Sequence, residues 1–228
     1  MRASSLFTAT ALILCGASAL AAAARAPGSV FDLAQWKLQI PGPAEVKDLK
    51  GYASDLFFLS AAEELCFHLD AAQKGTTPNT KYVRSELRHL PEWTVGESHT
   101  LSGEFRVAST LSPDKVTAMQ IHGITATGDN APPLLRIAVQ SGDLVAVLKT
   151  DSGGKRNDAV TLAKQLGPRF VKVDVTVRSQ QLIISVDGQV KLTRNLAYWK
   201  HLNYFKAGCY PQATQGAADV FFRKLQAE

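Results

Sequence analysis

The sequence has few cysteines, no long apolar run and no sustained helical periodicity. These absences disfavour a disulfide-rich, a membrane-spanning and a mainly helical protein, respectively. Only three cysteines occur among the 228 residues. The apolar run near the N-terminus is too short for a membrane span. No Pro/Ser linker, charge block or internal repeat divides the chain. These absences favour one domain, built mainly from strands, with no membrane partner.

Residues 1–24 have the composition of a secretory signal peptide. The cationic Arg2 precedes a short apolar run at residues 12–14, and an alanine-rich stretch follows at residues 19–24. We expect cleavage at the end of this stretch, so that residues 25–228 form a single mature domain. The expected location is therefore outside the cytoplasm, in the periplasm or secreted into the medium.

The charge of the mature chain is mild. Without Arg2 it contains 24 Lys and Arg against 20 Asp and Glu, a formal charge of +4. Such an excess suits an acidic polymer but is equally ordinary for an exported protein, and it does not point to nucleic acid. Charge alone therefore does not identify the partner.

Period-two patterns dominate the rest of the chain. Val171, Val173, Val175 and Val177 alternate with polar residues, and Asp187-Gly188 is a strong hairpin-turn signal. Further strands are expected at residues 65–69, 82–89, 100–107, 116–124, 134–139, 144–148, 182–184, 204–210 and 220–225. Helix should be scarce, limited to turns near 32–35 and 55–58. The pattern predicts an all-β fold, an antiparallel two-sheet sandwich.

Three short segments place polar side chains on alternate residues. They are Arg84, Glu86 and Arg88; Gln120 and His122; and Tyr204, Lys206, Tyr210 and Gln212. In extended chain, residues two apart point to the same face, while the residues between them can fill a core. We therefore expect all three rows on the outer face of one sheet, whose curvature would make a concave groove for an extended polymer. Taken singly, each row is more often an ordinary structural feature: a solvated charge ladder, incidental surface polar residues or part-buried sandwich aromatics.

Other ligand sites are not indicated by the sequence. The remaining histidines, His68, His89, His99 and His201, show no metal-ligand spacing with one another or with cysteine. The Gly-rich segment at residues 151–158 lacks the phosphate-loop pattern and is expected to be a hairpin tip. We therefore predict no metal and no cofactor.

The polar rows resemble the motifs of polysaccharide lyase family seven, the alginate lyases, which read R-S/T-E-L-R, Q-I/V-H and Y-F-K-A-G-x-Y-x-Q. Here they are RSELR at 84–88, QIH at 120–122 and YFKAGCYPQ at 204–212, and FDLAQWKLQIP at 31–41 resembles the family's opening strand. Three motifs in order are far more specific than one. The resemblance implies a β-jelly roll and cleavage of a 1,4-linked polyuronate by β-elimination.

The resemblance also implies roles for single residues. Arg84 and Gln120 would neutralise the sugar carboxylate, which otherwise disfavours removal of the adjacent C5 proton. Tyr210 would be the general acid and, for mannuronate, also the base, whereas His122 would be the base for guluronate. We expect Arg88 or Lys206 to lower the pKa of Tyr210.

The other polar residues of the three motifs are expected to bind sugar or to hold Arg84 and Arg88 in place. This substrate-binding set is Glu86, Arg88, Tyr204, Lys206 and Gln212.

Three functions remain open at this point. The first is an endo-acting, monomeric alginate lyase. In the family that the chain resembles, Ile rather than Val in the QIH motif is associated with guluronate-containing blocks, so Ile121 favours polyG or mixed MG as substrate. The second is a lyase for another polyuronate such as glucuronan. The third is a non-catalytic carbohydrate-binding jelly roll, which would need no proton-transfer pair. Glycoside hydrolysis is disfavoured because Glu86 is the only acid in the three rows.

Two cysteines, Cys66 and Cys209, remain in the mature chain, and an oxidising compartment would permit a bridge. Strand parity places Cys209 on the core side and Cys66 on the face opposite Leu65 and Phe67. We therefore favour free thiols over a disulfide.

Overall fold

The structure is a computed structural model that describes residues 24–75 and 82–228. Apart from Ala24, the expected signal peptide lies outside the described residues, so its assignment stays a prediction. Strands dominate, and the one helix in the described part is a 3-10 turn, η1 (Pro27–Ser29). None of the described helices is long and apolar enough to cross a membrane.

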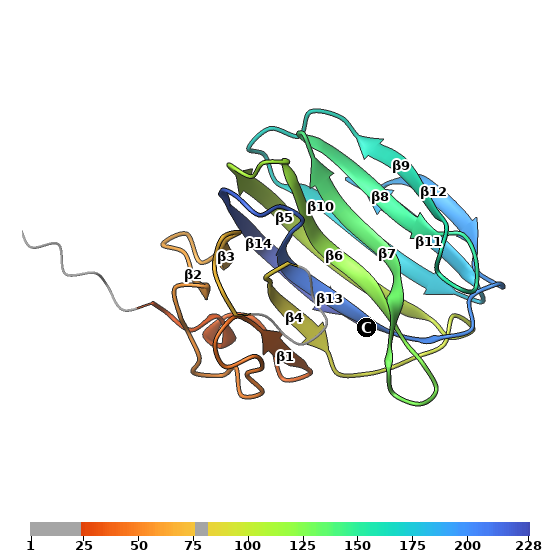
Figure 1. Cartoon of the computed structure of the whole chain (residues 1–228), viewed down its shortest axis with the longest axis horizontal. Helices are drawn as coiled ribbons and strands as arrows, with labels where there is room; N and C mark the ends of the chain where they lie inside the picture. Colours follow the sequence, from red (N-terminus) through yellow and green to blue (C-terminus); the bar gives the residue numbers. More distant parts are fainter. Residues whose placement is uncertain (1–23, 76–81) are drawn as a thin grey trace, which may run out of the picture.

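Fourteen strands form two antiparallel sheets of seven, stacked face to face (Figure 1). In spatial order, the first sheet contains β1 (Trp36–Gln39), β4 (Ser85–His89), β13 (Leu202–Pro211), β6 (Lys115–Ile124), β7 (Asn130–Gln140), β8 (Asp143–Lys149) and β9 (Asn157–Ala163). The second contains β12 (Gln189–Asn195), β11 (Gln181–Val186), β10 (Val171–Arg178), β5 (His99–Ser109), β14 (Ala217–Ala227), β3 (Leu65–Asp70) and β2 (Phe57–Leu59). The all-β, antiparallel two-sheet jelly roll is confirmed.

The core lies between the two sheets and is built by the alternation read from the sequence. Leu87, Ile121 and Phe205 of the first sheet are fully buried against residues such as Phe105 and Phe222 of the second. Burying one large apolar side chain contributes about 1.5–3 kcal/mol. This packing fixes which side of each strand faces inward and so sends the intervening polar residues of β4, β6 and β13 outward.

Some element predictions were wrong at the edges of the sheets. The segment expected to turn helically near residues 55–58 makes a tight turn, with Phe57 N–H donating to Ser54 O at 3.1 Å, and then enters β2. Strand β9 was not predicted, because its pattern is mostly exposed and polar. Edge strands have one unpaired side and need few apolar residues, so they give weak signals.

Strand β13 is irregular where it passes Gly208. The β13–β6 register shifts between Ala207 and Tyr210, which indicates a bulge. Gly208 has φ +151°, and a Cβ at this position would lie 2.4 Å from the Ser85 carbonyl oxygen. The local geometry therefore requires glycine, and it sets the position of Tyr210 two residues later.

The two cysteines of the described residues, Cys66 and Cys209, are both free, as expected, and both are buried, which parity had not predicted for Cys66. The Cys209 thiol faces the core and donates to Ala218 O at 3.5 Å. Cys66 lies on β3, paired in register with Phe58 on one side and Phe221 on the other. Burial raises the pKa of both thiols, so neither is a reactive thiolate.

Candidate active site

The outer face of the first sheet collects the polar rows of the three motifs. Lys206 of β13 lies between Arg88 of β4 and Gln120 of β6, and Tyr204 lies opposite His122. We refer to this surface as the polar face, formed by Arg84, Glu86, Arg88, Gln120, His122, Arg136, Tyr204, Lys206 and Tyr210. The groove expected from the sequence would run across it.

Glu86 is the centre of the polar face and is inaccessible to solvent. Its carboxylate accepts a hydrogen bond from the Gln120 amide and forms an ion pair with Lys206. Arg84 Nη1 lies 3.6 Å from Oε2 of Glu86, the same oxygen that pairs with Lys206. One buried carboxylate therefore holds an arginine, a lysine and an amide in fixed positions.

The charge states of this cluster follow from burial and mutual attraction. Burial alone would raise the pKa of Glu86, but Lys206 and Arg84 outweigh it and lower the pKa, so the carboxylate is ionised. Burial lowers the pKa of Lys206 to about 8, with Glu86 opposing the shift. At neutral pH the cluster of Arg84, Lys206 and Glu86 therefore carries one net positive charge, suited to an anionic ligand.

His122 is held in a state suited to accept a proton. Burial and the charge of Lys206 lower its pKa to about 4, so the ring is neutral at ordinary pH. Nδ1 lies 2.9 Å from the Gly123 carbonyl oxygen. Because a carbonyl only accepts, Nδ1 must carry the proton in this contact, which leaves the Nε2 lone pair free.

Tyr204 supports His122 rather than facing solvent. Its ring stacks on the imidazole with centroids 5.2 Å apart, and its hydroxyl lies 3.1 Å from Nδ1. The guanidinium carbon of Arg88 lies over the same ring, 4.0 Å from its centroid. Arg88 is in turn paired with Glu92. These contacts restrict the orientation of the imidazole.

Tyr210 lies beside Arg84, whose guanidinium carbon is 4.6 Å from the ring centroid. The expectation that Arg88 or Lys206 lowers the Tyr210 pKa is wrong, since Lys206 is paired with Glu86 and Arg88 lies over Tyr204. Burial raises the pKa of Tyr210, and the charge of Arg84 offsets this only in part. The phenol is therefore protonated and able to donate.

Three of the five residues expected to bind sugar are covered by neighbouring groups. Glu86, Lys206 and Tyr204 are 0%, 1% and 5% exposed, which favours the alternative role of holding other groups in place. Gln212 follows β13, and its Oε1 atom is buried without a hydrogen-bond partner in the described part of the chain. Arg88 remains partly accessible, with 13% of its side chain exposed.

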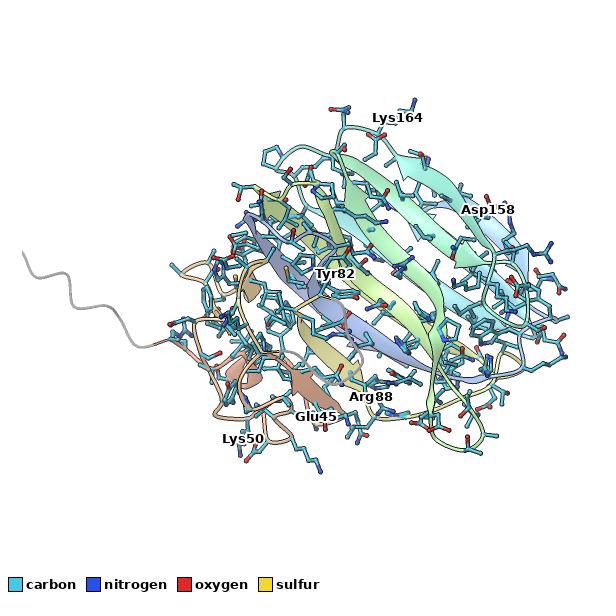
Figure 2. All side chains as sticks on the ribbon, in the orientation of Figure 1. Glu45, Lys50, Tyr82, Arg88, Asp158 and Lys164 are labelled. Atoms are coloured by element: carbon cyan, nitrogen blue, oxygen red, sulfur yellow. The ribbon has the colours of Figure 1, made fainter. Side chains whose placement is uncertain are left out.

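Two residues beside this cluster were missed by the sequence reasoning. Arg136 of β7 is the register partner of Gln120, and the Tyr82 ring lies 6.5 Å from that of Tyr210 (Figure 2 labels Tyr82). A single cation within the apolar run LLRIAV was a usable signal for Arg136, because parity places it opposite the core-facing Leu135 and Ile137. Tyr82 had a usable signal as well, because it lies two residues before Arg84 and the same alternation places it on the face of Arg84.

Metal-binding groups are not concentrated in this region. Within residues 24–75 and 82–228, no three His, Cys, Asp or Glu side chains are placed to hold an ion together. The side chains of the polar face themselves offer four cations, an amide donor, a neutral imidazole and a protonated phenol.

Comparison with known proteins identifies the family. A family model described as Alginate lyase matches residues 31–228 of the 228 in the chain. The chain belongs to this alginate lyase family. An alginate lyase from Photobacterium sp. (strain ATCC 43367) is 33% identical over 147 residues, and the match spans about half of each chain, 52% of both.

Solved structures of alginate lyases share the fold. The family 7 alginate lyase A1-II′, in a substituted form in complex with the substrate GGMG, has a TM-score of 0.81 at 29% identity, covering 90% of this chain and 97% of that one. The same lyase at 1.0 Å, described as a member of polysaccharide lyase family 7, gives 0.80 at 30% identity, covering 89% and 97%. Alginate lyase AlyC3, at 23% identity and a TM-score of 0.76, covering 90% and 96%, supports the fold alone.

Proposed function

We propose that this protein is an alginate lyase that cleaves a 1,4-linked polyuronate by β-elimination at the polar face. The observation that carries the proposal is the convergence of a neutral His122 and a protonated Tyr210 beside Arg84 and Gln120, which are both oriented by the buried Glu86. A carbohydrate-binding module would have no need of this proton-transfer pair.

The proposed reaction begins with charge neutralisation. The sugar carboxylate next to C5 would receive the Arg84 guanidinium and the second N–H of the Gln120 amide, the first being donated to Glu86. As the C5 proton leaves, negative charge spreads onto this carboxylate, and positioned donors stabilise it most in the transition state. Glu86 thus has an indirect role in the proposed reaction, because it fixes the orientation of the Gln120 amide.

Proton transfer would then complete the elimination. Nε2 of His122 takes the C5 proton, the electron pair forms the C4=C5 double bond, and the C4–O4 bond breaks while the Tyr210 hydroxyl gives its proton to O4. The products are one chain with a new reducing end and one with an unsaturated uronate at its non-reducing end. The proposed elimination consumes no water and requires no external cofactor for its atoms and electrons to balance.

The protonation states favour guluronate-containing blocks. In guluronate the C5 proton and O4 lie on opposite sides, which suits a separate base and acid, whereas in mannuronate Tyr210 would have to serve as both. Because burial raises the pKa of Tyr210, a phenolate base is disfavoured. We therefore propose activity on polyG or mixed MG blocks, and the relative A1-II′ is described in complex with GGMG and with the product GGG.

Endo action and export complete the proposal. Strands β1 and β4 extend the sheet on one side of β13 and β6, and β7 to β9 extend it on the other, so a polymer can continue in both directions. We propose that a monomer released to the periplasm or medium cuts within chains. Size-exclusion profiles of early products distinguish endo from exo action, and fractionation after expression of the full chain tests export.

The decisive experiment uses the purified mature chain with polyG, polyMG, polyM and polyglucuronate, following the ultraviolet absorbance of the new conjugated double bond. We expect the fastest increase on polyG or polyMG. Activity confined to polyglucuronate would assign the other polyuronate, and tight binding without absorbance change would assign a binding module. His122→Gln should remove activity on polyG more severely than on polyM.

A further inference from the structure

Positive charges on the polar face differ in whether they have an acidic partner. Toward β1, Lys37 Nζ lies 2.7 Å from Glu45, and Arg88 pairs with Glu92. Burial opposes ionisation of Glu45, but hydrogen bonds from Lys37 and Gln39 lower its pKa, so it stays charged. Figure 2 shows Glu45 and Arg88 near each other at this end. The cations on this side are therefore largely compensated.

Toward β7 and β8 the cations have no such partners. In the part of the chain that the structure describes, Arg136, Lys115 and Lys149 form no ion pair with any acidic side chain. Asp151 attracts Lys149 from a distance, but its carboxylate is engaged by backbone N–H groups of Lys155 and Arg156. Three positive charges therefore gather on one side of the catalytic groups.

These three cations also repel one another. Burial lowers the pKa of both Lys115 and Lys149, and the charge of Arg136 lowers it further. Arg136 is itself part-buried, and burial lowers its pKa while the nearby Tyr210 opposes the shift. An uncompensated, partly desolvated cluster of like charges weakens the fold, so its presence beside the catalytic groups points to an anionic ligand.

We propose that Arg136, flanked by Lys115 and Lys149, binds the carboxylate of the uronate next to the sugar that is cleaved. The inference rests on the proposed function. Arg136 faces outward beside Gln120 on the adjacent strand, and adjacent strands lie about 4.8 Å apart, which is comparable to the advance of a 1,4-linked sugar chain per residue. A guanidinium at this distance matches the next carboxylate along the polymer.

The kinetic test compares Arg136→Gln and Arg136→Lys with wild type on polyG. The carboxylate contact exists before and during the reaction, so its loss raises KM and leaves kcat nearly unchanged. We expect KM to rise about tenfold in Arg136→Gln and less in Arg136→Lys, which keeps the charge. Arg178→Gln, an exposed cation of the second sheet, is the matched control and should leave KM unchanged.

Two further measurements separate binding from a structural role. The wild-type KM should increase with salt, and the dependence should be shallower in Arg136→Gln. Thermal unfolding of Arg136→Gln should be unchanged or shifted upward, since repulsion with Lys115 and Lys149 is relieved. An unchanged KM and salt dependence, or a fall in kcat alone, would overturn the proposal.

Calorimetry with polyG distinguishes failure of this inference from failure of the proposed function. Here His122→Ala is compared with the double variant His122→Ala/Arg136→Gln, neither of which needs to turn over substrate. We expect weaker binding by the double variant. Equal affinity refutes the Arg136 site even if wild type is a lyase, whereas absence of lyase activity in wild type refutes the function and leaves the binding comparison valid.

Discussion

The Tyr204 hydroxyl lies 3.1 Å from Nδ1 of His122, and the two rings stack with an interplanar angle of 18°. The carbonyl of Gly123 accepts from the same nitrogen. The imidazole is thus oriented by one backbone group and one aromatic side chain, so the hydroxyl and the ring of Tyr204 can be tested separately.

Tyr204→Phe keeps the stacked ring and removes the hydroxyl. Because Gly123 still fixes the tautomer of His122, we expect a loss of about 1 kcal/mol, or about fivefold in kcat/KM. Tyr204→Ala also removes the ring between Arg88 and His122 and should cost considerably more. Steady-state kinetics on polyG measures both, and equal losses in the two variants would contradict a separate role for the ring.

The pH dependence of kcat/KM should show a broad plateau. In the proposed reaction His122 must be neutral to accept a proton, and its pKa of about 4 predicts that activity falls only as the pH drops toward that value. In the proposed reaction Tyr210 must be protonated to donate, and its raised pKa places its own titration above the ordinary tyrosine range, so a decline already near pH 8 would report loss of the Lys206 charge. An acid limb near the unperturbed histidine value would contradict the assigned environment of His122.

Glu86→Gln should destabilise the protein in a pH-dependent manner. Without the carboxylate, Lys206 is a buried unpaired cation, and breaking such a pair costs about 3 kcal/mol. Because Glu86 raises the pKa of Lys206, its removal lowers that pKa below the wild-type value of about 8, so the loss relative to wild type should be largest at low pH and should shrink as the pH rises toward 8. Urea unfolding at several pH values measures this trend.

A second substitution provides the control for this prediction. Glu86→Gln/Lys206→Met removes both charges and should recover part of the stability at neutral pH, while activity stays low because Gln120 has lost its carboxylate partner. Stability that remains as low as in Glu86→Gln would show that the unpaired cation is not the cause.

The buried His89 should make the folding stability of the protein sensitive to acid, independently of the proposed reaction. Burial, with the charges of His99 and Arg88, lowers its pKa from 6.5 to about 4. The folded state therefore binds fewer protons than the unfolded state, and about 3 kcal/mol of stability present above pH 6.5 is lost as the pH falls toward 4. His89→Phe should reduce the slope of the stability curve across this window, as followed by urea unfolding, and the remaining slope should come from His122, whose pKa is also lowered to about 4. An unchanged slope would exclude His89.

Gly208→Ala should disrupt both the fold and the site. The new Cβ would meet the Ser85 carbonyl oxygen at 2.4 Å and the Glu86 Cα at 2.6 Å, neither of which can move freely. We expect a loss of about 3 kcal/mol or more from the contact and the positive φ together. Gly51→Ala, where nothing lies within 4 Å, is the control for the thermal unfolding measurement.

Much of the fold was predictable because strand periodicity survives in the sequence. The expected strand at residues 204–210 corresponds to β13 (Leu202–Pro211), and Leu87, Ile121 and Phe205 face the core as parity required. The polar edge strand β9 was missed because its side chains bury little apolar surface. The alternation of apolar and polar residues indicates which strands have a buried face, so a strand without a buried face is not detected by it.

The candidate site was predictable as a set of residues but not as a network. Parity placed Glu86, Lys206 and Tyr204 on the correct face, yet it could not show that their neighbours cover them completely. The sign of the Tyr210 pKa shift was wrong for the same reason, because burial depends on the packing of several side chains together. Pairings such as Lys206 with Glu86 depend on strand order, which the sequence alone did not give.

Strand β13 is hydrogen-bonded between β4 and β6, although it is the second-last strand in the chain. Until it inserts, Arg84 and His122 belong to strands with no common neighbour, and Tyr204, Lys206 and Tyr210 are absent from the sheet. A nascent chain that still lacks its last 30 or so residues, about the length of β13 and β14 with their connection, has no assembled catalytic centre. The candidate site can therefore assemble only after Leu202–Pro211 has been synthesised and has paired with both neighbouring strands.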